Sequence, residues 1–264
     1  MSTPPPAHVE VIRPRPVAGP ALRLFLLHHV GGSSLAFSNW PQWFPADWDI
    51  CLVETPGRGR LAHLAPYDCV TSLARGFTDS LNDLRRTTDT LDLLDAPFAL
   101  YGHSMGGLVA YETTLWLTKR GRPAPVWMGI SACGSPDVAS AADTPPPLHT
   151  LPGAQLREAL RQWGGLPPAA FEDDGLWALL EPRIRADFAL VENWRAPSAD
   201  QGRISVPLSL FGGIDDPLVS AKDLLTWGHR ADRLVGQHFF PGGHFYFTGQ
   251  EQAVADQIVM DAGS

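Results

Sequence analysis

Serine, histidine and aspartate side chains occupy positions from which they could perform acyl-transfer chemistry. The sequence Gly102-His103-Ser104-Met105-Gly106 lies between an apolar run and a stretch with helical spacing. A sharp turn from a strand into a helix would strain the backbone of Ser104, and the two glycines would avoid a Cβ clash. The unpaired N–H groups at the start of that helix would face a developing oxyanion. We therefore predict that Ser104 is a nucleophile.

A serine attacks a carbonyl only when a base takes its proton, and that base needs a carboxylate to orient it. Both partners follow predicted strands later in the chain, with Asp216 after residues 206–211 and His244 after residues 234–240. The order Ser, Asp, His is that of the α/β hydrolases. We favour Asp216 as the carboxylate, and Asp215, which fits a shorter version of the same turn, remains an alternative.

An oxyanion needs two converging N–H donors. In this architecture one comes from the residue after the nucleophile and the other from the loop after an early strand, which predicts Met105 and Val30. The sequence around the neighbouring histidines gives less indication of a catalytic role. We expect His103 to pack within the turn, and His28 and His29 to structure the loop before Val30.

Strands and helices alternate along most of the chain. This alternation predicts an α/β fold with a mostly parallel central sheet and helices on both faces. The predicted strands are residues 22–27, 50–53, 98–101, 126–133, 206–211 and 234–240, and the predicted helices include residues 70–94, the stretch after Ser104, and 251–260.

The domain organisation follows from where this alternation starts and breaks. Residues 1–20 are rich in proline and predict a flexible arm, and residues 21–264 predict a single domain. Residues 135–202 combine a Pro-rich loop with helical spacing that Pro182 interrupts. Such an insertion between two core strands is typical of a lid.

Composition excludes several classes of protein. The net charge of −8 argues against non-specific nucleic-acid binding. The sequence contains neither an apolar run long enough for a membrane span nor the order of a signal peptide, so we expect a cytoplasmic protein. The three scattered cysteines have neither disulfide nor metal-ligand spacing, and we expect no metal.

With these motifs the chain resembles the type II thioesterases of polyketide synthases and nonribosomal peptide synthetases. The resemblance implies an α/β-hydrolase fold and hydrolysis of acyl or aminoacyl thioesters from the phosphopantetheine arm of a partner carrier domain. It implies no cofactor of the enzyme's own, and we expect a monomer. The matching stretches are Val30–Ser33 with Trp40, Pro56–Arg60, Gly102–Gly107 with Tyr111 and Glu112, Ile184–Phe188 and Gly242–Tyr246.

The resemblance also implies a helical lid over an acyl chamber. Trp163, Trp177 and Phe188 are candidates for lining that chamber, with packing inside the lid as the alternative. Arg58 and Arg60 are candidates for contacting a carrier domain or the phosphate of its arm, or they form a solvated turn.

One departure from the family pattern leaves the substrate open. The first loop in such enzymes usually reads Pro-x-Ala-Gly-Gly, whereas here His28 and Val30 replace the proline and the alanine. The alternatives are a product-releasing or cyclising thioesterase of the same pathway, an esterase or lactonase of free substrates, and a scaffolding protein that has lost the chemistry.

Overall fold

The computed structural model describes residues 9–87, 93–138 and 146–263. Within these ranges seven strands form one sheet in the order β1-β3-β2-β4-β5-β6-β7, and all neighbouring strands are parallel except β1 and β3, which are antiparallel. The strands are β1 Glu10–Ile12, β2 Leu22–Leu27, β3 Trp48–Glu54, β4 Phe98–His103, β5 Trp127–Ser131, β6 Leu208–Gly213 and β7 Leu234–Phe240.

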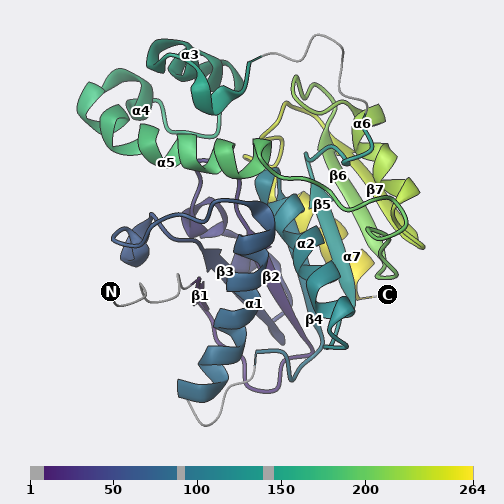
Figure 1. The fold of residues 1–264 in the computed structure, drawn as a ribbon. Coiled ribbons are helices and arrows are strands. Elements are labelled where there is room, and N and C mark those ends of the chain that lie inside the picture. Colours follow the sequence, from purple (N-terminus) through teal and green to yellow (C-terminus); the bar gives the residue numbers. More distant parts are fainter. Residues whose placement is uncertain (1–8, 88–92, 139–145, 264) are drawn as a thin grey trace.

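Apart from the short α6, the helices lie in three groups around this sheet (Figure 1). Helices α1 and α2 cover one face, α7 covers the other, and α3, α4 and α5 form a layer above the sheet. The helices are α1 Val70–Thr87, α2 Met105–Lys119, α3 Gly153–Trp163, α4 Ala169–Glu172, α5 Asp174–Glu192, α6 Ala221–Leu225 and α7 Glu251–Ala262.

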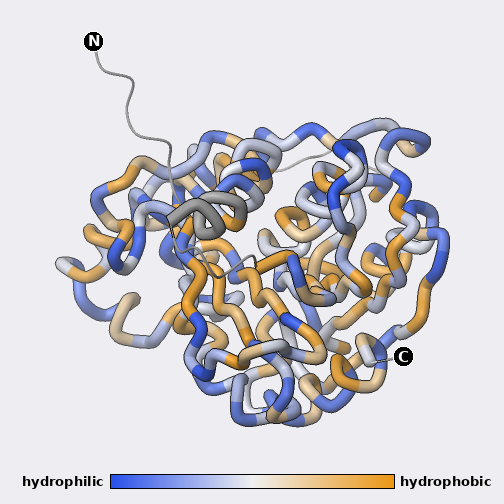
Figure 2. The backbone as a smooth tube through the Cα atoms, turned by 90° about the horizontal axis from the view of Figure 1, so that it is seen from below, coloured by the Kyte–Doolittle hydropathy of each residue, from blue (hydrophilic) through white to orange (hydrophobic). Residues whose placement is uncertain are grey.

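Successive side chains along the inner strands point to opposite faces of the sheet, so a hydrophobic core forms on each face. In β2, Phe25 and Leu27 pack into the cluster under α1 and α2, whereas Leu24 and Leu26 pack into the cluster that contains α7. Figure 2 shows hydrophobic segments gathered in the central strands and hydrophilic ones in the loops around them. Burying each such side chain contributes about 1.5–3 kcal/mol, so the sheet is a firm platform for loops at its carboxyl edge.

Two elements differ from the sequence prediction. Helix α5 runs without interruption through Pro182, although a proline inside a helix removes one N–H donor. Trp177 before the proline and Ile184 after it are both buried in the cluster of the helical layer, so packing on both sides keeps the helix continuous.

The second difference lies in the predicted arm of residues 1–20. Residues 10–12 form β1, which pairs antiparallel with β3 so that Val11 faces Val53. The residues Val11 and Ile12 are β-branched and favour a strand, and the Val9 N–H donates to Ser80 Oγ at 2.9 Å. Residues 1–8 of the predicted arm and residues 139–145 of the predicted lid lie outside the described ranges.

Candidate active site

The turn between β4 and α2 presents Ser104 in a strained backbone conformation. Its φ is 54° and its ψ is −118°, a region that residues other than glycine rarely adopt. A Cβ on Gly102 would lie 2.0 Å from the Gly106 carbonyl oxygen, and a Cβ on Gly106 would lie 2.2 Å from the Leu27 carbonyl oxygen. Glycine is therefore required on both sides of Ser104 for the turn to fit against β2.

His244 and Asp216 form a buried hydrogen-bonded pair. His244 Nδ1 lies 2.9 Å from Asp216 Oδ2, and the two side chains are 6% and 1% exposed. The other carboxylate oxygen accepts from the backbone N–H groups of Leu218 at 2.8 Å and Val219 at 3.1 Å. The structure thus brings Asp216 to His244, whereas Asp215 is exposed.

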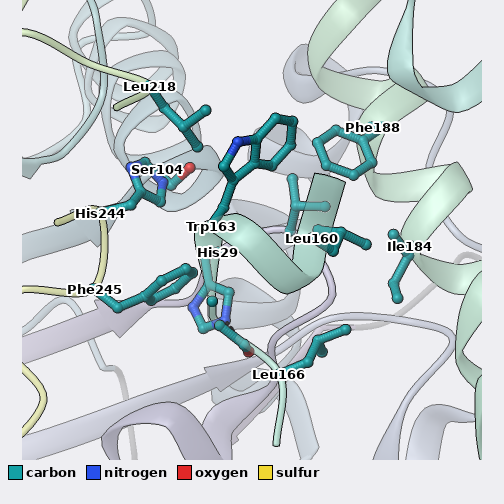
Figure 3. A pocket seen from close by; sticks show the side chains of 13 residues that line it. His29, Ser104, Leu160, Trp163, Leu166, Ile184, Phe188, Leu218, His244 and Phe245 are labelled. Carbon is teal, nitrogen blue, oxygen red and sulfur yellow. Dashed lines mark hydrogen bonds between the residues drawn. The ribbon is translucent and has the colours of Figure 1, made fainter. Parts of the chain in front are cut away.

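This pairing fixes the role of each imidazole nitrogen. A carboxylate accepts, so Nδ1 of His244 carries the hydrogen and Nε2 is left to accept a proton. Ser104 and His244 line the same cavity, and in the view of Figure 3 both side chains lie on the side away from Phe188 and Ile184. The arrangement can deprotonate Ser104 as it attacks a carbonyl.

The cavity is roofed by the helical layer. Trp163 and Leu160 of α3 and Ile184 and Phe188 of α5 line it from the side of this layer, and Figure 3 labels all four. The cavity is partly open, and its volume is about 40 Å³, which holds roughly three water molecules. The side chains of the roof therefore limit the size of the acyl group that fits in this cavity.

The predicted lid residues divide between two environments. Trp163 and Phe188 line the cavity. Trp177, in contrast, packs inside the helical layer beside Phe171 and donates its indole N–H to Glu181 Oε2 at 2.7 Å. The structure therefore places Trp177 in the core of the lid and not in the cavity wall.

Of the two predicted oxyanion donors, Val30 belongs to the cavity wall and Met105 is the chain neighbour of a wall residue, Ser104. Met105 is also the first residue of α2. Among the described residues, neither backbone N–H has a hydrogen-bond acceptor of its own. Both N–H groups remain free to bind the oxygen of a substrate carbonyl.

Three buried histidines surround this site and are kept neutral. Burial lowers the pKa of His28 and His103 well below the usual value, and it lowers that of His29 to about 4. His103 Nδ1 lies 2.8 Å from Ser131 Oγ, and its ring packs 5.1 Å from that of His244. As neutral groups they place no positive charge near the imidazolium that His244 would form during proton transfer.

The structure contradicts both predictions for Arg58, a contact with a carrier domain and a solvated turn. Its guanidinium is buried and forms an ion pair with Asp187 of α5, so it is neither a solvated turn residue nor free to contact a partner. Arg60 differs, since its side chain is 88% exposed and lies 3.5 Å from Glu10 Oε1.

The sequence analysis assigned no role to Asp187 and Arg183, although both contact the loop that contains Val30. The Gly31 N–H donates to Asp187 Oδ2 at 2.8 Å, and Arg183 Nη2 donates to the Gly31 carbonyl oxygen at 2.8 Å. Arg183 and Asp187 are four positions apart, so on a helix they lie on the same face. This spacing is the sequence signal that could have indicated a shared role.

Within the described ranges, no group of three or more His, Cys, Asp or Glu side chains is arranged to hold a metal ion. A helix suited by length and apolarity to crossing a membrane is likewise missing from these ranges.

Comparisons with known proteins agree with this geometry. Residues 22–261 match the thioesterase domain family. The chain is 27% identical over 225 residues to the gramicidin S biosynthesis protein GrsT of Aneurinibacillus migulanus, a match that covers 85% of this chain and 82% of GrsT.

Solved structures give the same result. YbtT, the type II thioesterase of the yersiniabactin NRPS/PKS pathway, is 32% identical with a TM-score of 0.80, covering 96% of this chain and 98% of YbtT. RedJ, a thioesterase of the prodiginine pathway in Streptomyces coelicolor, is 29% identical with a TM-score of 0.77, covering 94% and 97%.

Proposed function

The chain belongs to the thioesterase domain family, with the α/β-hydrolase fold, and from that membership we propose that it is an editing thioesterase of type II. Its substrates are acyl or aminoacyl groups bound as thioesters to carrier proteins of a polyketide synthase or nonribosomal peptide synthetase. The observation that supports this best is the buried His244–Asp216 pair beside Ser104 under a helical roof.

Acylation uses the three side chains in sequence. Ser104 Oγ attacks the thioester carbonyl while His244 Nε2 takes the hydroxyl proton, and Asp216 stabilises the resulting imidazolium. The N–H groups of Val30 and Met105 bind the oxyanion. When the tetrahedral intermediate collapses, the C–S bond breaks and His244 returns its proton to the departing thiolate.

Deacylation repeats these steps with water as the nucleophile. His244 Nε2 takes a proton from water as the oxygen attacks the acyl–Ser104 ester, and the same proton returns to Ser104 Oγ when the acid leaves. The side chains and backbone N–H groups that take part belong to this chain, and the phosphopantetheine arm belongs to the carrier partner.

The proposal extends to the partner and the location. The enzyme acts as a cytoplasmic monomer that meets one carrier domain at a time. The exposed guanidinium of Arg60, on the loop after β3, is available to a phosphate or an acidic surface of such a partner.

The test compares one acyl group presented in two ways. The wild-type protein should hydrolyse an acetyl or aminoacyl carrier-domain thioester with a higher kcat/KM than the matched ester of a small alcohol. The Ser104→Ala protein, checked for an unchanged unfolding midpoint, should hydrolyse neither. Equal kcat/KM values for both substrates would instead assign the chain to the esterases of free substrates.

A further inference from the structure

The peptide bond between His29 and Val30 is held by a buried network on one side of the active site. This inference rests on the proposed function, because the N–H of this peptide is the one that we assign to the oxyanion. The described part of the chain has no cis peptide bonds, so the Val30 N–H points away from the His29 carbonyl oxygen. Whatever fixes the carbonyl therefore fixes the direction of the N–H.

Two donors hold this carbonyl oxygen, the backbone N–H of Gly32 at 3.1 Å and the side chain of His28. His28 Nδ1 lies 2.9 Å from the His29 carbonyl oxygen, and since a carbonyl can only accept, Nδ1 donates the hydrogen. Burial keeps this imidazole neutral by lowering its pKa. Its Nε2 is then an acceptor and receives the hydroxyl hydrogen of Thr55 at 3.1 Å.

Arg58 is the origin of this chain of hydrogen bonds. Its guanidinium donates to Thr55 Oγ1, and this accepted bond leaves the Thr55 hydroxyl hydrogen free to point at His28. The same guanidinium pairs with Asp187 of α5. One buried cation thus reaches the loop through two different partners.

Asp187 holds the opposite side of Val30. Its Oδ2 accepts the Gly31 N–H, and Arg183 donates to the Gly31 carbonyl oxygen. Gly31 has a φ of +72°, and a Cβ there would lie 3.1 Å from Ile184 Cγ1. The whole residue therefore lies flat against one face of α5, a helix of the roof.

We propose that His28, Arg58 and Asp187 are positioning residues that orient the His29–Val30 peptide so that its N–H faces the substrate carbonyl. A proline at position 28, as in the usual family pattern, has no side-chain donor for this carbonyl. The histidine of this chain therefore supplies a constraint of its own, and the helix of the roof shares in building the oxyanion site.

The test separates donor orientation from substrate binding by using a p-nitrophenyl ester, which needs the same serine chemistry but no carrier domain. Replacing His28 by leucine keeps a buried side chain but removes the donor, and we expect kcat to fall at least about tenfold, part of the 10²–10³ that losing an oxyanion donor costs. KM should stay within about twofold, because the ground-state ester gains little from this bond.

Two further measurements distinguish positioning from folding. His28→Asn places an amide N–H near the position of Nδ1 and should restore kcat to within about threefold of wild type. A trifluoromethyl ketone, which forms a tetrahedral adduct with Ser104, should bind His28→Leu more weakly by the same factor as kcat falls. Unchanged kcat in His28→Leu, or no rescue by His28→Asn, overturns the proposal.

Asp187→Ala tests the second anchor, with Asp49→Ala as its matched control. Asp49 is also buried in ion pairs, with Arg13 and Arg23, but it lies near the start of β3, at the opposite end of that strand from Glu54. Both variants should lower the unfolding midpoint, and only Asp187→Ala should lower kcat. An equal loss of kcat in both variants overturns the positioning role of Asp187.

The outcomes also separate this proposal from the function on which it rests. If the wild-type protein shows no preference for carrier-bound thioesters while His28→Leu still slows ester hydrolysis, the carrier function fails and the positioning network stands. If wild-type protein hydrolyses neither ester nor thioester, both fail.

Discussion

Asp215 and Asp216 are adjacent carboxylates with opposite surroundings, and this difference predicts opposite consequences of one substitution. Asp216→Asn should lower kcat by about 10³–10⁴-fold, because an amide in place of the carboxylate no longer holds the His244 tautomer or stabilises its charged form. Steady-state hydrolysis of an acyl thioester measures this loss.

Asp215→Asn is the matched control at the residue scale. The Asp215 side chain is exposed, and its backbone N–H bonds the Gly242 carbonyl oxygen, a contact that asparagine retains. We expect kcat within about twofold of wild type and an unfolding free energy within about 0.5 kcal/mol of it. Comparable losses in the two variants would contradict the assignment of Asp216.

Single residues were predictable where their local sequence carried the information. Ser104 directly follows β4, and His244 lies in the glycine-containing turn after β7, so turn chemistry marked both. Arg58 gave no such signal, because its partner Asp187 lies 129 positions away and only the folded chain brings them together. The choice between Asp215 and Asp216 likewise needed the position of the His244 ring.

The turn between β4 and α2 is the element on which the nucleophile depends, and Gly102→Ala tests it. The added methyl group would meet the Gly106 carbonyl oxygen at 2.0 Å, and backbone atoms on both sides cannot move apart without breaking the turn. We expect a loss of about 3 kcal/mol or more in unfolding free energy and no measurable thioesterase activity. Urea unfolding and turnover assays measure the two effects.

Gly228→Ala is the control for this element. A Cβ at Gly228 meets no atom within 4 Å, so the variant should unfold within about 0.5 kcal/mol of wild type and keep its activity. If Gly102→Ala were equally mild, the turn would not have the rigidity that the close approach of Gly102 and Gly106 indicates.

The roof helices predict how the enzyme selects acyl chains. Trp163→Ala removes a cavity-lining indole, and we expect kcat/KM for an octanoyl thioester to rise about tenfold relative to that for an acetyl thioester. Trp177→Ala removes an indole of the same size from the lid core, so it should lower stability and leave this ratio unchanged. Equal shifts in both variants would mean that lid stability, and not chamber size, sets the preference.

The helices and strands were predicted correctly where the local sequence pattern favoured the same structure as the packing in the folded chain. The bounds of β2 and β7 match the predicted runs, because each is an apolar stretch that ends at turn residues. The prediction was wrong at Pro182, where packing of Trp177 and Ile184 outweighs one lost hydrogen bond. It was wrong at β1 as well, since three residues between proline-rich stretches become a strand only when β3 offers an edge.

For the whole molecule, the buried histidines make stability depend on pH. A group whose pKa falls on folding binds more protons in the unfolded chain, so the folded state loses stability as pH drops below the unfolded value of 6.5. For His29, whose folded pKa is about 4, this amounts to about 2 kcal/mol between pH 7 and pH 5. His28 and His103 act in the same direction.

Urea unfolding of wild-type protein and His29→Gln at pH 7 and pH 5 checks this dependence. The loss of stability between the two pH values should be about 2 kcal/mol smaller in the variant. His63→Gln, at an exposed position, should lose as much stability as wild type. An identical loss in all three proteins would show that His29 is protonated in the folded state.

The short strand β1 closes an edge of the sheet that would otherwise be open. Its three residues are the only ones among those described that pair with the outer side of β3. A shortened protein that begins at residue 13, without the proline-rich leader, would expose a row of unsatisfied N–H and C=O groups along β3, which is a template for strand pairing between molecules. Such trimming therefore invites self-association and aggregation, although it removes no residue of the active site.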